Sequence, residues 1–244
     1  IIVTGAGLPT NMPEFTKNFS DVALVPIVSS AKALRIICKR WKDRYAKIPD
    51  AVIVEGPLSG GHQGFSYEDC FKPECQLEAI LPKVVDEAKQ WGDIPVIAAG
   101  GVWDRKDIDT MISLGASGVQ MGTRFLGSLE CDAQAYRDIM PKITKEDIVL
   151  IKSPVGYPAR AIKMGVLERL EEGNAPKIRC VSNCVSPCHR GQEAKKVGYC
   201  IADSLGAGHL GDRVNGLYFT GANGYRIEKI QSVKEIITEL VSDV

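Results

Sequence analysis

The sequence predicts an α/β fold of the (β/α)8 TIM-barrel type, in which parallel strands alternate with helices. Short runs of apolar, β-branched residues end in glycine or small residues, and a longer amphipathic stretch follows most of them. Such uninterrupted apolar runs are typical of strands that are buried on both faces of a parallel sheet. Because the connections are short, the pattern indicates consecutive βα units.

Five strands are predicted in the first half of the chain, at Ile1–Gly5, Ala23–Ser29, Ala51–Gly56, Ile94–Gly101 and Gly118–Thr123. Three amphipathic helices are expected among them, at Ala31–Arg44, Leu77–Trp91 and Asp104–Leu114. Asp104 is a residue type that commonly caps a helix N-terminus, which supports a helix start at that position.

The alternation changes after Thr123. Helices are expected at Gly127–Met140, Met164–Glu172, Tyr199–Ala207 and Ser232–Val241, and strand-like runs at Asp147–Lys152 and Leu217–Gly221. We therefore expect three segments: βα units of the barrel at 1–125, a cap or insertion with a cysteine-rich stretch at 126–216, and a closing strand and helix at 217–244 that pack on the barrel.

Composition limits the function classes. The 244 residues contain 30 Lys and Arg and 30 Asp and Glu, so bulk charge gives no reason to expect nucleic acid or an anionic membrane as partner. No apolar run approaches the roughly 20 residues of a membrane-spanning helix. Because no signal peptide is visible, we expect a cytoplasmic protein, and we expect no disulfide framework from its eight cysteines.

Two consecutive predicted strands end in glycine motifs, AAGG at 98–101 and MGTR at 121–124. In α/β barrels, backbone N–H groups after the last two strands often bind a phosphate, and glycine lets the backbone approach it closely. Alternatively, Gly100, Gly101 and Gly122 only permit tight turns. If these strands are the seventh and eighth, three strands would precede Ile1, and we expect the sequence to lack them.

One of the three histidines lies in the stretch VEGPLSGGHQGF, residues 54–65. His62 follows the predicted strand Ala51–Gly56, at the end where barrel enzymes have their active site. A neutral imidazole there can accept a proton from a substrate or hydrogen-bond a ligand. The alternative is a histidine on an exposed loop, and the neighbouring phosphate motifs favour the functional interpretation.

Five motifs, EGPLSGGHQG, VIAAGG, GVQMGTRFL, SPVGYPARAI and GANGYRIEKI, together resemble the nitronate monooxygenase family, formerly called 2-nitropropane dioxygenases. The resemblance implies an FMN-dependent oxidoreductase that oxidises alkyl nitronates with O2 and uses His62 as acid and base. It further implies that the flavin contacts the following residues: Ser59, Gly60, Gly61, Gly100, Gly101, Gly122 and Thr123.

Two other functions stay open. The same superfamily contains flavin-dependent enoyl-acyl-carrier-protein reductases, which would use NAD(P)H and an enoyl thioester. A barrel that binds a phosphate ligand without catalysis is the third alternative. In the first two the partner is a small-molecule substrate, and a homodimer is one candidate assembly.

Four cysteines fall within one short stretch, Cys180, Cys184, Cys188 and Cys200. They are candidate ligands of zinc or an iron–sulfur cluster, although their spacing matches no standard framework. They are alternatively unligated, or reactive thiols beside basic residues. His189 follows Cys188 and is a further candidate for a metal site, whereas His209 is expected on the polar surface. Arg160 is expected either to contact an anionic substrate or the flavin, or to pair with a carboxylate.

Overall fold

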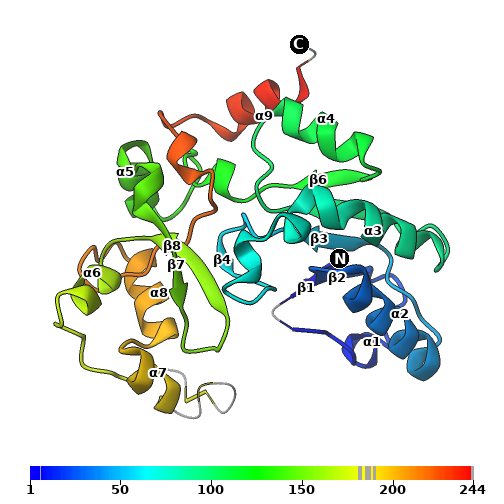
Figure 1. Ribbon diagram of the computed structural model, residues 1–244, viewed down its shortest axis with the longest axis horizontal. Coiled ribbons are helices and arrows are strands. Elements are labelled where there is room, and N and C mark those ends of the chain that lie inside the picture. The colour runs from blue at the N-terminus through cyan, green and yellow to red at the C-terminus, as the bar shows by residue number, and fades with distance from the viewer. Residues whose placement is uncertain (6, 181–182, 185–187, 189–190, 243–244) are drawn as a thin grey trace. The chain divides into compact units, whose positions relative to one another are not determined.

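The computed structural model describes residues 1–5, 7–180, 183–184, 188 and 191–242. The chain forms two compact units (Figure 1). The first contains Ile1–Leu58 and Glu68–Met121, and the second contains Ser59–Tyr67 and Gly122–Val244. Residues 59–67, predicted within the barrel segment 1–125, belong to the second unit, and the boundary at 125 stays a prediction. Residues 217–244 share a unit with 122–216, and their packing on a barrel stays a prediction.

The first unit is built on a parallel five-stranded sheet in the order β1-β2-β3-β5-β6. Its strands are β1 (Ile2–Thr4), β2 (Leu24–Val28), β3 (Val52–Glu55), β5 (Val96–Ala99) and β6 (Gly118–Gln120). All five predicted strands are therefore confirmed, in sequential order and parallel, as consecutive βα units require.

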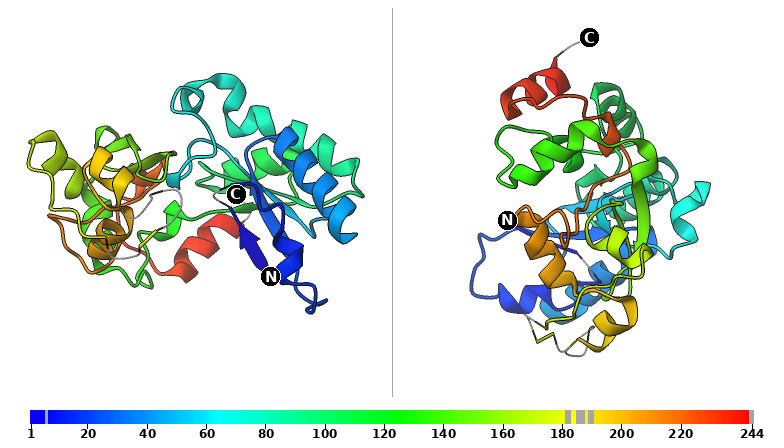
Figure 2. Two further views of the ribbon diagram at one scale, coloured as in Figure 1. Left: turned by 90° about the horizontal axis from the view of Figure 1, so that it is seen from below. Right: turned by 90° about the vertical axis from the view of Figure 1, so that its left-hand side faces the viewer.

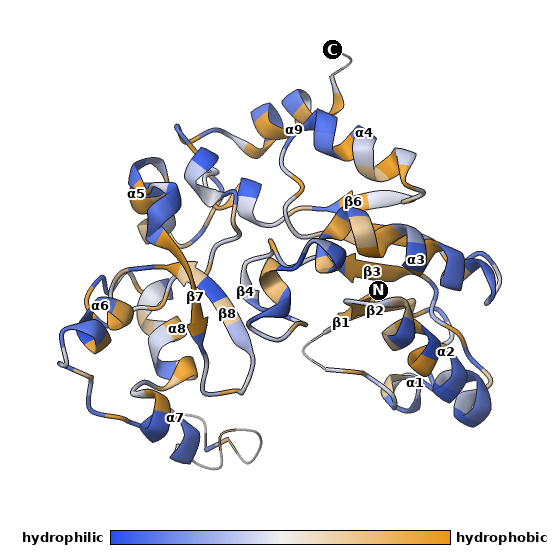
Figure 3. Ribbon diagram, viewed as in Figure 1, coloured by the Kyte–Doolittle hydropathy of each residue, from blue (hydrophilic) through white to orange (hydrophobic). Residues whose placement is uncertain are grey.

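Four helices belong to this unit: α1 (Met12–Phe15), α2 (Ala31–Tyr45), α3 (Leu77–Lys89) and α4 (Arg105–Ser113). Helices α2 and α3 pack against each other and against the central strands (Figure 2). The predicted apolar face of α2 is fully buried. In Figure 3, β3 is coloured as hydrophobic, whereas α2 and α3 mix hydrophobic and hydrophilic residues. Asp104 caps α4 as predicted, by accepting the N–H of Asp107 at 3.0 Å.

The second unit contains an antiparallel three-stranded sheet in the order β4-β8-β7. Its strands are β4 (Gly61–His62), β7 (Ile148–Lys152) and β8 (Pro158–Ile162). Only β7 was expected. The second half of the segment SPVGYPARAI forms β8, where no strand was expected. Pro158 is compatible with this because it stands at the first position of the strand.

The helices of the second unit are α5 (Gln134–Ile139), α6 (Val166–Glu171), α7 (Gln192–Val197), α8 (Ile201–His209) and α9 (Val233–Val241). Helix α7 was not expected. The helix predicted at Gly127–Met140 is wrong in its first half, because residues 127–129 bond to the backbone of Gln231 instead. The strand predicted at Leu217–Gly221 is also wrong: a single bridge joins Phe219 to Ala161.

Among the helices of the described residues, none has the length and apolar character needed to cross a membrane.

Candidate functional site

His62 is held by its backbone on one side and an aromatic ring on the other. Strand β4 pairs with β8, and His62 stands opposite Ala159. Gly61 before it has φ +71°, which favours glycine, and a Cβ there would lie 3.3 Å from the ring of Phe219. That ring meets the imidazole edge-on, with the centroids 5.3 Å apart. The histidine therefore stands on a short strand rather than on a free loop.

A hydrogen bond fixes the imidazole from a third direction. Nε2 of His62 lies 2.7 Å from Oγ of Ser153, which is buried. The hydroxyl of Tyr199, 1% exposed, donates to the carbonyl of Lys152 at 2.9 Å. Burial raises the pKa of Tyr199 to about 12, and a hydrogen bond with the Ser153 side chain opposes that rise. Ser153 thus bonds to the imidazole, and Tyr199 bonds to the backbone of Lys152, the residue before Ser153.

Burial lowers the pKa of His62 below its ordinary value of 6.5. Removing the imidazole from water disfavours its charged form. The ring is consequently neutral at pH 7 and able to accept a proton, which is the state that a general base requires.

Gln63, 2% exposed, closes the turn that precedes His62. Its amide nitrogen donates to the carbonyls of Ser59 and Gly61, both at 2.9 Å, and its amide oxygen accepts from the Ser59 hydroxyl at 3.3 Å. Ser59 was predicted to lie near a flavin, and that role stays a prediction. Gln63 was not among the predicted site residues, although its place directly after His62 and before Gly64 was an available signal.

Gly60 allows two backbone segments to meet. A Cβ there would lie 2.8 Å from the carbonyl carbon of Thr220 and 2.9 Å from the nitrogen of Gly221. The N–H of Gly221 also donates to Oγ1 of Thr123 at 2.9 Å. The structure therefore brings predicted site residues from the turn before His62 and from the segment after β6 to the same stretch of backbone.

The predicted glycines of the first unit have clear packing roles. Gly100 and Gly101 follow β5 with φ +88° and +100°. A Cβ on Gly100 would lie 2.5 Å from the carbonyl oxygen of Gly56, and one on Gly101 would lie 3.0 Å from the side chain of Leu58. The tight-turn interpretation thus holds for both, and their contact with a phosphate stays a prediction.

Gly122 differs from these glycines. Its φ is −112°, and no atom lies within 4 Å of the position a Cβ would take. It precedes the 3₁₀ helix Thr123–Phe125, whose first N–H groups have no partner inside the helix. Thr123 accepts a bond from Gly221, so its own hydroxyl hydrogen remains available as a donor. Neither local strain nor packing accounts for a glycine here.

Arg160 lies on β8 opposite Gly61 and is 9% exposed. Its predicted contact with an anionic substrate or the flavin stays a prediction.

Within the described residues, the clustered cysteines Cys180, Cys184, Cys188 and Cys200 do not form a ligand set. No group of three or more His, Cys, Asp or Glu side chains suited to a metal ion occurs in the described part of the chain. Cys180 is exposed and Cys188 is buried, and all four are free thiols. The structure therefore gives the zinc or iron–sulfur hypothesis no support. His189, a further candidate for a metal site, lies outside the described residues, and His209 is exposed, as expected.

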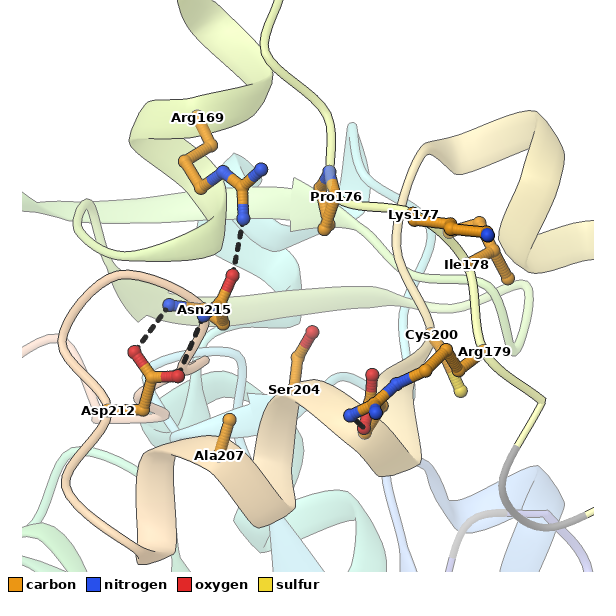
Figure 4. Close-up of a pocket in the computed structure, with 11 residues that line it drawn as sticks. Arg169, Pro176, Lys177, Ile178, Arg179, Cys200, Ser204, Ala207, Asp212 and Asn215 are labelled. Carbon is orange, nitrogen blue, oxygen red and sulfur yellow. Dashed lines mark hydrogen bonds and ion pairs between the residues drawn. The ribbon is translucent and has the colours of Figure 1, made fainter.

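Cys200 lines a cavity of about 270 Å³ beside α8 (Figure 4). Its charged groups largely bind one another: Arg169 donates to Asn215, Asn215 donates to Asp212, and Arg179 lies 3.6 Å from Asp203. None of the predicted flavin-contacting residues lines this cavity.

Comparisons with known proteins agree with the motifs. The family model of nitronate monooxygenase matches residues 1–243. A probable nitronate monooxygenase of Staphylococcus aureus strain Newman is 37% identical over 135 residues, which are 52% of this chain and 36% of the relative.

Two solved structures share the fold. FabK from Thermotoga maritima superposes on 98% of this chain and 66% of its own, with a TM-score of 0.72 and 28% identity. A nitroalkane oxidase from Streptomyces ansochromogenes superposes on 98% of this chain and 63% of its own, with a TM-score of 0.66 and 21% identity. The matched region spans about a third of the curated relative, and the chain spans less than two thirds of either solved relative.

Proposed function

The chain belongs to the nitronate monooxygenase family, and from this premise we propose that the protein is an FMN-dependent oxidoreductase that oxidises alkyl nitronates with O2. His62 acts as acid and base. The observation that carries the proposal is a half-buried, neutral imidazole fixed by Ser153 and Phe219 at the end of a glycine-rich turn. A fixed imidazole with a lowered pKa is typical of catalytic sites.

His62 has a defined task in this reaction. With a neutral nitroalkane, it takes the proton from the carbon beside the nitro group and so produces the nitronate. With a nitronate supplied directly, no such proton remains. FMN, when bound, supplies the redox chemistry between the nitronate and O2, and the protein holds the reactants and moves the proton.

The residues present suit an FMN phosphate. Gly122 has open space beside its Cα, and Thr123 has a hydroxyl hydrogen available. Backbone N–H groups that have no acceptor inside their helix, together with a hydroxyl, are the donors that bind phosphates in such folds. We propose that Gly122 and Thr123 contact the phosphate, and that Gly100 and Gly101 approach the flavin with their backbone.

Replacing Gly122 with alanine separates this role from folding. Because φ at this position suits alanine and no atom crowds the Cβ, the melting temperature is expected to stay unchanged. A methyl group facing the phosphate is expected to weaken FMN binding at least about tenfold, or about 1.4 kcal/mol. Titration of the apoprotein with FMN, followed by flavin fluorescence, measures this. Riboflavin, which lacks the phosphate, is the control ligand. The assignment is contradicted if the variant loses the same affinity for riboflavin as for FMN, or if its affinity for FMN is unchanged.

The pH dependence follows from the lowered pKa of His62. The base must be neutral, and its neutral form persists to lower pH than in an ordinary histidine. The pH at which kcat/KM for a neutral nitroalkane falls to half its plateau value is therefore expected to lie below 6.5, the ordinary pKa of histidine. A profile with freshly dissolved nitroalkane measures this, and an inflection above pH 6.5 is the contrary result.

An enoyl-thioester reductase that uses FMN and NAD(P)H is the second candidate, since the superfamily that the motifs resemble contains such enzymes and FabK shares the fold over 98% of the chain. An oxygen electrode separates the two. Oxygen uptake with propyl-2-nitronate supports the proposed function. Oxidation of NADH or NADPH that depends on an enoyl thioester, without nitronate-dependent oxygen uptake, supports the reductase. If the FMN-loaded protein shows neither reaction, the non-catalytic alternative remains.

A further inference from the structure

We propose that the cavity beside α8 binds the phosphate group of a small ligand, through Ser204, Arg169 and Lys177. The cavity is lined by residues of the second unit, and none of the predicted flavin-contacting residues is among them. The site is therefore additional to the proposed reaction, and the inference does not rest on the proposed function.

One face of α8 forms part of the cavity wall. Four residues line it at spacings of three and four, which places them on the same side of the helix: Cys200, Asp203, Ser204 and Ala207. The N–H groups of the first helical turn have no acceptor inside the helix, and Cys200 at the N-cap makes no side-chain hydrogen bond. A helix start of this kind favours a negatively charged group beside it.

Ser204 supplies a buried polar group that lacks a partner. It is 5% exposed, and its hydroxyl makes no hydrogen bond within the part of the chain that the structure describes. Figure 4 shows this hydroxyl pointing from α8 toward the space between the lining residues. A buried hydroxyl without a hydrogen bond destabilises the folded protein. A ligand oxygen in the cavity would supply the missing partner.

Two cationic side chains of the lining lack a carboxylate in direct contact. Lys177 is exposed, and its ammonium group has no hydrogen bond or ion pair among the residues described. Arg169, on α6, donates to the backbone carbonyl of Asn174 at 3.0 Å and to the side chain of Asn215, both uncharged groups. These neutral partners orient the guanidinium without neutralising its charge.

The two carboxylates of the lining are engaged elsewhere. Asp203 lies 3.6 Å from Arg179. Asp212 accepts the side-chain amide of Asn215 at 2.7 Å with one oxygen and two backbone N–H groups at 2.9 and 3.0 Å with the other. With three cations against two carboxylates, the lining keeps an excess of one positive charge, which favours an anionic ligand.

A phosphate group suits these donors. It carries three strong acceptor oxygens and more than one negative charge at neutral pH. The donors come from three segments: Arg169 from α6, Lys177 from the chain between α6 and α7, and Ser204 from α8. The cavity volume of about 270 Å³ is just below the usual range of about 300–1,000 Å³ for small-molecule pockets, so free phosphate or a small phosphomonoester fits.

Alkylation of Cys200 measures whether the cavity is occupied, because this thiol lines it. Native protein is treated with iodoacetamide in sodium phosphate, or in sodium chloride of equal ionic strength, and each cysteine is followed by peptide mass spectrometry. Saturating phosphate is expected to slow labelling of Cys200 at least about threefold. Cys75, a half-buried thiol of the first unit, is expected to react equally in both salts. Equal rates at Cys200 in both salts overturn the proposal.

Lys177→Gln tests the charge without changing the interior, since Lys177 is exposed. The affinity for phosphate, from titration of the labelling rate, is expected to fall about tenfold, as for a lost hydrogen bond to a charged group. Lys234→Gln is the matched control, at an exposed lysine of α9 that does not line the cavity. Equal affinities of the two variants overturn the role of Lys177.

Ser204→Ala tests the buried hydroxyl. Because this hydroxyl has no partner in the described residues, the melting temperature without phosphate is expected to stay unchanged or to rise. Protection of Cys200 by phosphate is expected to be lost. Unchanged protection in the folded variant overturns the role of Ser204.

Other anions identify the source of the phosphate group. Protection at lower concentration by glycerol 3-phosphate than by inorganic phosphate supports a phosphomonoester, and the reverse order supports free phosphate. Equal protection by sodium acetate contradicts a phosphate site.

Discussion

The His62→Gln variant is expected to oxidise a neutral nitroalkane about a hundred- to ten-thousand-fold more slowly than the wild-type protein, the usual contribution of a general base. With the preformed nitronate as substrate, the same variant is expected to keep most of its rate, because no proton has to be removed from carbon. Glutamine retains a polar group near Ser153, so the fold and FMN binding are expected to persist. Oxygen uptake with each substrate, at equal flavin content, measures the difference.

The control is His209→Gln. His209 is exposed at the end of α8, and this change is expected to affect neither substrate. Equal loss with nitroalkane and nitronate in the His62 variant would mean that His62 binds substrate rather than removing the proton. Full activity of the His62 variant with both nitroalkane and nitronate would mean that His62 has no role in the reaction.

The Gly100→Ala variant is expected to be destabilised by about 2 kcal/mol or more. Its Cβ would lie 2.5 Å from the carbonyl oxygen of Gly56, a contact that requires the backbone to shift, and φ of +88° is strained for alanine. Strain of the backbone alone costs about 1–3 kcal/mol. Urea unfolding followed by circular dichroism measures the free energy of unfolding.

Gly118→Ala is the matched control in the same unit. Gly118 has no atom within 4 Å of the position of a Cβ, and its φ is not positive. Its free energy of unfolding is expected to change little or to rise slightly, because alanine loses less chain entropy on folding. Similar stability of the two variants would show that the turn after β5 adapts to a side chain, contrary to the close packing against Gly56.

The parallel sheet was predictable because each of its strands has a local signature. Runs such as Val52–Glu55 and Val96–Ala99 are buried apart from single positions, so their continuous apolar character is visible in the sequence. The same reasoning failed at Leu217–Gly221. This run is apolar because Leu217 and Tyr218 are buried, but one bridge at Phe219 is all the strand pairing it makes.

The candidate site was predictable in part. His62 and the glycines before it were identifiable from residue type and position. The partner of His62 was not, because Ser153 lies 91 residues away in the sequence and only the pairing of β4 with β8 brings the two segments together. The sequence also does not show why a position holds glycine. Gly100 and Gly122 both follow a predicted strand, yet only at Gly100 would a Cβ lie too close to a neighbouring atom.

The most direct test of the proposed function is anaerobic mixing of the FMN-loaded protein with propyl-2-nitronate, and separately with NADH and NADPH, followed by the flavin absorbance. The proposed function requires that the nitronate changes the flavin spectrum and that the nicotinamides do not. Bleaching by a nicotinamide, with no response to the nitronate, would contradict it and identify a reductase instead.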